Sequence, residues 1–197
     1  MILLFLFFVI ETSYVEAQLL DLTNLDTAKI YTSLEEALEQ PENVYRLYLK
    51  RKRLSEFPEG IFKILSLQEL NLSKNKITEI PGEIANLSNL QVLNVSKNKL
   101  KTIPAGIGQL MQLKQLIIYQ NGIYSLPPEI GNLENLEFLD MWGNEIIKFP
   151  HEISKLKKLR VLDLRVIEMN KDRSNAIKEL LPNTKIYFSK SCNCGSG

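Results

Sequence analysis

Residues 90–112 read LQVLNVSKNKLKTIPAGIGQLMQ, and this stretch decides the fold because much of the chain repeats its pattern. Aligned units begin at six positions, each 23 residues after the last: Val44, Leu67, Leu90, Leu113, Leu136 and Leu159. No insertion interrupts the series. Repetition at a fixed period of this length is typical of a solenoid, in which each unit buries its apolar face only against its neighbours.

Each half of the unit predicts a different local structure. Leu93 and Val95 alternate with polar neighbours, which predicts a short strand with one buried face. Pro104 opens a return limb, and Ile107 and Leu110 follow it at a spacing of three residues. That spacing predicts a short helical or 3₁₀ turn on the outer side. The chain is therefore expected to form an α/β solenoid whose strands stack side by side in one sheet.

An asparagine recurs at the turn that follows each predicted strand of the inner units. Its short amide can hydrogen-bond backbone groups that would otherwise be buried without partners. We expect these side chains to form a structural ladder through the stack: Asn75, Asn98, Asn121 and Asn144. Lys52 and Ile167 occupy the same place in the first and last units, as expected for repeats with a neighbour on only one side.

This pattern resembles the leucine-rich repeat superfamily, and specifically its 23-residue class with Leu-Pro-x-x-Ile in the second half. The clearest match is residues 123–133, Ile-Tyr-Ser-Leu-Pro-Pro-Glu-Ile-Gly-Asn-Leu. Similar units occur in Ras-suppressor and plant Ras-group-related proteins and in small secreted bacterial ones. The resemblance implies a right-handed horseshoe with a parallel concave sheet. It covers six repeats over residues 44–169 and does not identify a partner.

The segments outside the repeats predict a leader, two caps and a tail. Residues 1–17 combine a short apolar core with small residues before Gln18, which is typical of a cleaved signal peptide. Residues 18–43 should form an N-terminal cap, with a helix beginning after Ser33. Residues 170–188 should form a C-terminal cap, with a helix and an edge strand. We expect 189–197 to be a disordered tail, whose Cys192 and Cys194 could form a small disulfide, bridge two chains or have no role.

Composition and motifs argue against catalysis and cofactors. The net charge is +1, so nothing points to nucleic acid or to an anionic membrane. Two cysteines cannot complete a structural zinc site, and we expect no metal and no cofactor. The single histidine, His151, stands alone on the outer limb without a nucleophile motif nearby. No second long apolar run follows the leader, so the mature chain should be soluble and should not insert into a membrane. We also expect it to be a monomer.

One part of the predicted concave face suggests a partner site. Residues that alternate with the buried leucines should face outward, and in the fourth to sixth units they are apolar, aromatic and charged. We name this group the concave patch: Ile117, Tyr119, Phe138, Asp140, Trp142, Asp163 and Arg165. Exposed aromatics surrounded by charge are typical of an interface centre. The same rings could instead pack on one another as ordinary cross-strand pairs.

Together these features predict a secreted or cell-surface, non-catalytic module that binds a protein on its concave face. Two alternatives remain. An intracellular signalling regulator of the Ras-suppressor type fits if the leader is not functional. A glycan-binding module fits if Trp142, Tyr119 and the carboxylates beside them hold a sugar.

Overall fold

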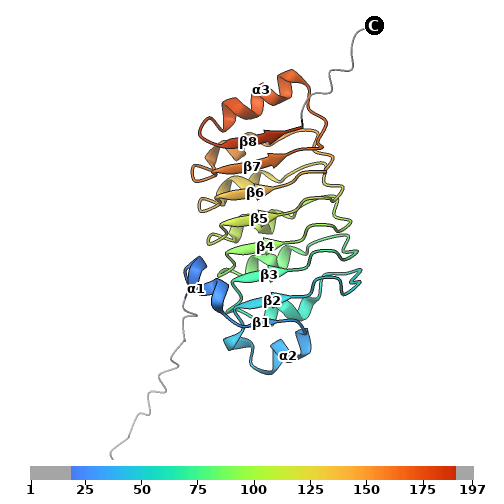
Figure 1. Ribbon diagram of the computed structural model, residues 1–197, viewed down its shortest axis with the longest axis vertical. Helices are drawn as coiled ribbons and strands as arrows, with labels where there is room; N and C mark the ends of the chain where they lie inside the picture. Colours follow the sequence, from blue (N-terminus) through green and yellow to red (C-terminus); the bar gives the residue numbers. More distant parts are fainter. Residues whose placement is uncertain (1–18, 190–197) are drawn as a thin grey trace, which may run out of the picture.

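A computed structural model describes residues 19–189, and this part of the chain is built around one sheet of parallel strands (Figure 1). The predicted leader and residues 190–197 of the predicted tail lie outside the described residues. The eight strands follow one another in chain order: β1 Ile30–Tyr31, β2 Arg46–Tyr48, β3 Glu69–Asn71, β4 Val92–Asn94, β5 Gln115–Ile117, β6 Phe138–Asp140, β7 Val161–Leu164 and β8 Lys185–Phe188. The predicted α/β solenoid is confirmed.

The repeat period sets the register of the sheet. From β2 to β7 each residue pairs with the one 23 positions later, as in Leu70 with Leu93 and Leu116 with Leu139. The central leucine of each of these strands is completely buried: Leu47, Leu70, Leu93, Leu116, Leu139 and Leu162. Burial of one such side chain stabilises the fold by about 1.5–3 kcal/mol. Because the column runs the length of the stack, the core is continuous.

Short 3₁₀ helices form the opposite side of the solenoid, as the three-residue spacing predicts. They are η2 Glu59–Lys63, η3 Gly82–Asn86, η4 Ala105–Gln109, η5 Pro128–Asn132 and η6 His151–Lys155, and a further one, η1 Pro41–Asn43, precedes β2. A proline occupies the N-cap of each of η2 to η6. In η4 the carbonyl of Pro104 accepts the amide of Ile107 at 3.1 Å. Proline fixes φ at this entry and needs no hydrogen-bond partner for its own nitrogen.

A left-handed backbone residue ends each turn after the strands, with φ between 49° and 66°. The column recurs every 23 residues: Arg51, Lys74, Lys97, Gln120, Gly143 and Val166. In this conformation the amide of Lys97 reaches the carbonyl of Tyr119 in the next repeat at 2.8 Å. Only Gly143 adopts such a φ without steric cost, so the other members are strained by roughly 1–2 kcal/mol each. The hydrogen bonds between the turns of consecutive repeats compensate for this strain.

The two ends of the stack are closed by the caps. The helix α2 Leu34–Glu39 begins at Ser33, whose hydroxyl accepts the amide of Glu36, and it packs beside η2 at the first repeat. The helix α3 Lys171–Leu180 precedes β8 at the other end (Figure 1). The sequence patterns did not predict β1 or the helix α1 Leu22–Thr27. Ser189, placed in the predicted disordered tail, accepts the amide of Val166 at 2.6 Å.

Candidate functional site

The concave patch occupies three neighbouring strands and the turns that follow them. Ile117 on β5 and Asp140 on β6 are register partners, and Asp140 is in turn the partner of Asp163 on β7. Ile117, Phe138 and Asp140 are half-buried, because they alternate with the fully buried leucines of the same strands. The sheet therefore brings the predicted residues of three repeats into one surface.

Two aromatic rings of the concave patch stack on each other. The ring centroids of Tyr119 and Trp142 are 5.3 Å apart, and the ring planes differ by 8°. The ammonium of Lys97 lies 5.7 Å from the Tyr119 centroid, so the repeat before adds a cation. Both rings are half-buried and keep part of their surface in solvent. They thus form a cross-repeat pair, as the alternative interpretation expects, and also a partly exposed aromatic surface.

The charged members of the concave patch differ in how they are paired. Arg165 binds Asp163 through two nitrogens, with Nη2 donating to Oδ2 at 2.6 Å and Nε donating to Oδ1 at 3.0 Å. Asp163 is only 6% exposed, so it is a buried support for Arg165 rather than the outward-facing carboxylate that the sequence predicts. Asp140 remains at the surface. Burial, with a smaller contribution from the charge of Asp163, raises the pKa of Asp140 from its ordinary value of 3.8 to about 6.

The residues that are equivalent to Tyr119 in the two preceding repeats, Ser73 and Ser96, do not form part of an exposed surface. Alternation with the buried strand residues predicts that they face outward, but both are buried, Ser96 completely. The hydroxyl of Ser96 donates to Oδ1 of Asn94 at 2.7 Å. A serine side chain is too short to project past the turn, whereas the long rings of Tyr119 and Trp142 reach solvent from the same place.

The four ladder asparagines make the backbone hydrogen bonds expected of a structural ladder. Nδ2 of Asn98 donates to the carbonyls of Leu72 at 3.0 Å and Val95 at 2.9 Å, and Oδ1 accepts the amide of Ile77 at 3.0 Å. The same arrangement recurs in the other three repeats that carry a ladder asparagine, at Asn75, Asn121 and Asn144. Each amide therefore links two consecutive turns.

A second polar cluster lies at the N-terminal end of the sheet, where the sequence predicts outward-facing side chains. Arg46 is instead 7% exposed, and its Nε donates to Glu69 at 2.6 Å. Its Nη1 donates to the carbonyl of Asp26 at 2.6 Å, so the segment carrying α1 covers it. Tyr48 donates to Glu69 at 2.5 Å, and burial together with this hydrogen bond raises the pKa of Tyr48 to about 12.

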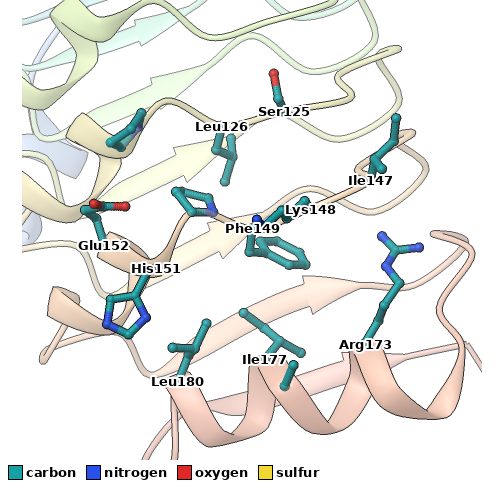
Figure 2. Close-up of a pocket in the computed structure, with 13 residues that line it drawn as sticks. Ser125, Leu126, Ile147, Lys148, Phe149, His151, Glu152, Arg173, Ile177 and Leu180 are labelled. Carbon is teal, nitrogen blue, oxygen red and sulfur yellow. The ribbon is translucent and has the colours of Figure 1, made fainter.

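A hollow of about 660 Å³ separates α3 from the outer limbs of the last repeats (Figure 2). Its walls are mainly apolar, with Leu126 and Phe149 facing Ile177 and Leu180 of α3. The guanidinium of Arg173 at its edge donates to the carbonyls of Glu168 and Ile146. Because Arg173 belongs to α3 and Ile146 to a repeat, this side chain links the C-terminal cap to the stack. His151 is exposed at the opposite edge. The hollow is the seam between the C-terminal cap and the stack, and no sequence pattern predicts it.

Two further properties follow from the described residues. In 19–189 no three histidine, cysteine, aspartate or glutamate side chains gather closely enough to hold a metal ion. Within the same range, no helix has the length and apolar character needed to cross a membrane.

The family pattern described as leucine-rich repeat region matches residues 55–186. The chain is a leucine-rich repeat protein. A comparison with curated proteins found no match. Among solved structures, a leucine-rich repeat protein of Leptospira interrogans is 32% identical, with a TM-score of 0.65 over 81% of this chain and 48% of its own.

Two plant structures share the repeat fold. A chain of the BIR3–SERK2 complex from Arabidopsis thaliana is 34% identical, with a TM-score of 0.51 over 56% of this chain and 62% of its own. The ectodomain of the Arabidopsis receptor kinase GASSHO1/SCHENGEN3, in complex with CASPARIAN STRIP INTEGRITY FACTOR 2, is 27% identical, with a TM-score of 0.59. That match covers 81% of this chain and 19% of the ectodomain. This leucine-rich repeat chain spans less than two thirds of each of the three structures.

Proposed function

We propose that this leucine-rich repeat protein is a non-catalytic module that binds a protein partner through the concave patch. The observation that carries the proposal is the stacked pair Tyr119–Trp142, two half-buried rings beside the half-buried Asp140. Large rings held rigid by stacking lose little conformational entropy on binding, and such residues dominate the energetics of many interfaces. Two of the structurally similar plant proteins were solved as protein complexes, which supports binding of a protein over binding of a small molecule.

We also propose that the protein acts outside the cytoplasm. The apolar run at residues 2–10, followed by Val15-Glu16-Ala17, supports export from the cytoplasm and cleavage before Gln18. N-terminal sequencing of the native protein from separated cell fractions tests this directly. Mature protein that begins at Gln18 outside the cytoplasm is expected, and full-length protein with Met1 in the cytosol would contradict export.

The binding role is tested by capture on the immobilised chain from native extracts, in parallel with the Trp142→Ala, Tyr119→Ala double variant. A specific protein partner should be retained by the wild-type chain and lost from the double variant. The same two proteins should be applied to a glycan array. Selective glycan binding that requires both rings, without a protein partner, would replace this proposal with the sugar-binding alternative.

A further inference from the structure

Asp163 and Arg165, the charged groups that act on Asp140, are paired with each other, whereas the Asp140 carboxylate has no ion-pair partner among residues 19–189. Directly after β7, the guanidinium of Arg165 binds Asp163 by three hydrogen bonds of 2.6 to 3.0 Å. On the other side Lys97 lies at the Tyr119 ring. None of the ion pairs formed between residues 19 and 189 includes Asp140. Of the two adjacent carboxylates, Asp163 is paired with Arg165 and Asp140 has no ion-pair partner within the part of the chain that the structure describes.

The apolar surroundings of Asp140 make its unpaired charge unfavourable for the folded state. Ile117 is its register partner on β5, and Phe138 and Trp142 stand two positions before and after it along the chain. The only hydrogen bond assigned to its carboxylate among the described residues comes from the backbone amide of Trp142, at a long 3.3 Å. A half-buried carboxylate in an apolar setting loses hydration, and this one long hydrogen bond compensates for little of that loss.

The other end of the same sheet shows how this fold neutralises a carboxylate internally. Glu69 accepts Nε of Arg46 at 2.6 Å and the hydroxyl of Tyr48 at 2.5 Å, so both of its oxygens have strong donors. The Arg46 side chain is 8% exposed and the Glu69 side chain 13%. Asp140 occupies a similar half-buried position without any such donor. No cation or hydroxyl of residues 19–189 takes this place at Asp140, so its carboxylate is available to a cation from a partner.

We propose that the concave patch accepts an arginine side chain of a protein partner, whose guanidinium pairs with Asp140 beside the Trp142 and Tyr119 rings. This inference rests on the proposed function and adds the chemistry of the partner. Arginine fits better than lysine because its planar guanidinium is weakly hydrated, binds a carboxylate with two donors and also stacks on aromatic rings. Apolar residues on either side of that arginine would cover Ile117 and Phe138.

Random dodecapeptides displayed on phage provide a defined probe of this surface. They are selected on the purified wild-type chain after removal of peptides that also bind the Trp142→Ala, Tyr119→Ala variant. Selected peptides are then synthesised with arginine, with lysine and with citrulline, which keeps the shape of arginine without its charge. Calorimetric titration of each peptide against wild type and Asp140→Asn forms a double-mutant cycle, and Glu134→Gln, an exposed acid outside the patch, is the matched protein control.

The expected selection is enriched in arginine. Replacement of that arginine by citrulline should weaken binding to the wild type and to Glu134→Gln tenfold or more, but binding to Asp140→Asn by less than about threefold. Replacement by lysine should weaken wild-type binding by an intermediate factor. Wild-type affinity should also fall between about pH 7.5 and pH 5, as Asp140 becomes protonated, and the Asp140→Asn chain should lose this dependence.

Two results would overturn the inference in different ways. If peptides require Trp142 and Tyr119 but lack arginine, or lose the same affinity to citrulline on both proteins, the patch binds proteins without a guanidinium at Asp140. In that case the proposed function stands and this inference fails. If no peptide depends on the two rings, the concave patch is not a protein-binding surface and both proposals fail together.

Discussion

The indole of Trp142 lies parallel to the phenol ring of Tyr119, 5.3 Å away, although the two residues belong to different repeats. The stack exists because the residues occupy the same place in two consecutive units, and the parallel register brings that place together. Neither ring is fully buried, so the pair couples one repeat to the next and also offers an aromatic surface to solvent. The coupling of the repeats can be measured as the free energy of unfolding, and the role of the exposed aromatic surface as affinity for a partner.

Removal of both rings should weaken partner binding strongly and destabilise the fold only modestly. The double variant Trp142→Ala, Tyr119→Ala should weaken partner affinity by roughly thirtyfold or more, since a pair of anchor residues contributes about 2 kcal/mol or more. Its free energy of unfolding should fall by only about 1–2 kcal/mol, because the stack adds about 0.5–1.5 kcal/mol beyond its buried area. Titration against the captured partner and chemical denaturation give the two values.

Tyr124→Ala is the appropriate control, because its ring is 44% exposed and lies outside the concave patch. Ser73 and Ser96, at the equivalent place in the two preceding repeats, are unsuitable as controls because both are buried. A double variant that binds as tightly as wild type would move the partner site away from this pair.

Asn98 should be essential for stability, because its amide pairs backbone groups of two turns at once. Asn98→Leu keeps the approximate size of the side chain and leaves those groups without partners. The free energy of unfolding should fall by about 1–3 kcal/mol. Denaturant unfolding beside Asn86→Leu, a change of the same type at an exposed position, checks this. Equal losses in the two variants would mean that the ladder bonds contribute nothing.

Gly143 should resist substitution for a backbone reason. Its φ is +66°, and a Cβ there would lie 3.3 Å from Cγ of Gln120. Gly143→Ala should therefore lower the free energy of unfolding by about 1–2 kcal/mol. Gly82→Ala is the matched control, since a Cβ at Gly82 meets nothing within 4 Å. Thermal melting of the two variants compares them, and a larger loss for Gly82→Ala would contradict the argument.

The sequence predicted the features that are repeated in residue type, together with the cap helices α2 and α3, but it did not predict α1 or β1. The leucine, proline and asparagine columns recur every 23 residues, so one unit is enough to predict the strands, the outer 3₁₀ helices and the ladder positions. The helix α1 belongs to no repeat. Its segment is fixed by contacts distant in the chain, such as the amide of Leu20 donating to Gln68 and Arg46 donating to Asp26. No local pattern encodes such pairs.

Side-chain size explains the uneven prediction of the candidate site. Alternation along a strand predicts which side a residue faces, but exposure also depends on how far its side chain extends. Ser96 and Tyr119 occupy equivalent places, yet Ser96 is completely buried and Tyr119 reaches solvent. The pairing of Arg165 with Asp163, which leaves Asp140 without a cation, likewise depends on rotamers rather than on sequence spacing. The left-handed φ of Lys74 and Lys97 has no sequence signal, because lysine has no preference for it.

The ionised carboxylate of Asp140 should destabilise the folded chain. Because burial raises its pKa from 3.8 to about 6, the native state holds the proton more tightly than the unfolded state does. Ionised Asp140 therefore destabilises the fold above about pH 6; this penalty fades as the pH falls through that value and is absent below 3.8. Asp140→Asn keeps an acceptor for the Trp142 amide and removes the charge. At pH 7.5 it should raise the free energy of unfolding by about 1–2 kcal/mol, less than the full pKa shift would give, because solvent screens a charge that is only half-buried.

Denaturant unfolding at about pH 7.5 and about pH 3.5 measures both variants. The stability gain of Asp140→Asn should be present at the higher pH and nearly absent at the lower one. Glu134→Gln, at an exposed position, should show no gain at either. A loss of stability at neutral pH would mean that Asp140 makes a structural bond that stabilises the ionised form. A gain in stability combined with weaker binding is instead the behaviour of a group kept for recognition at a cost to the fold.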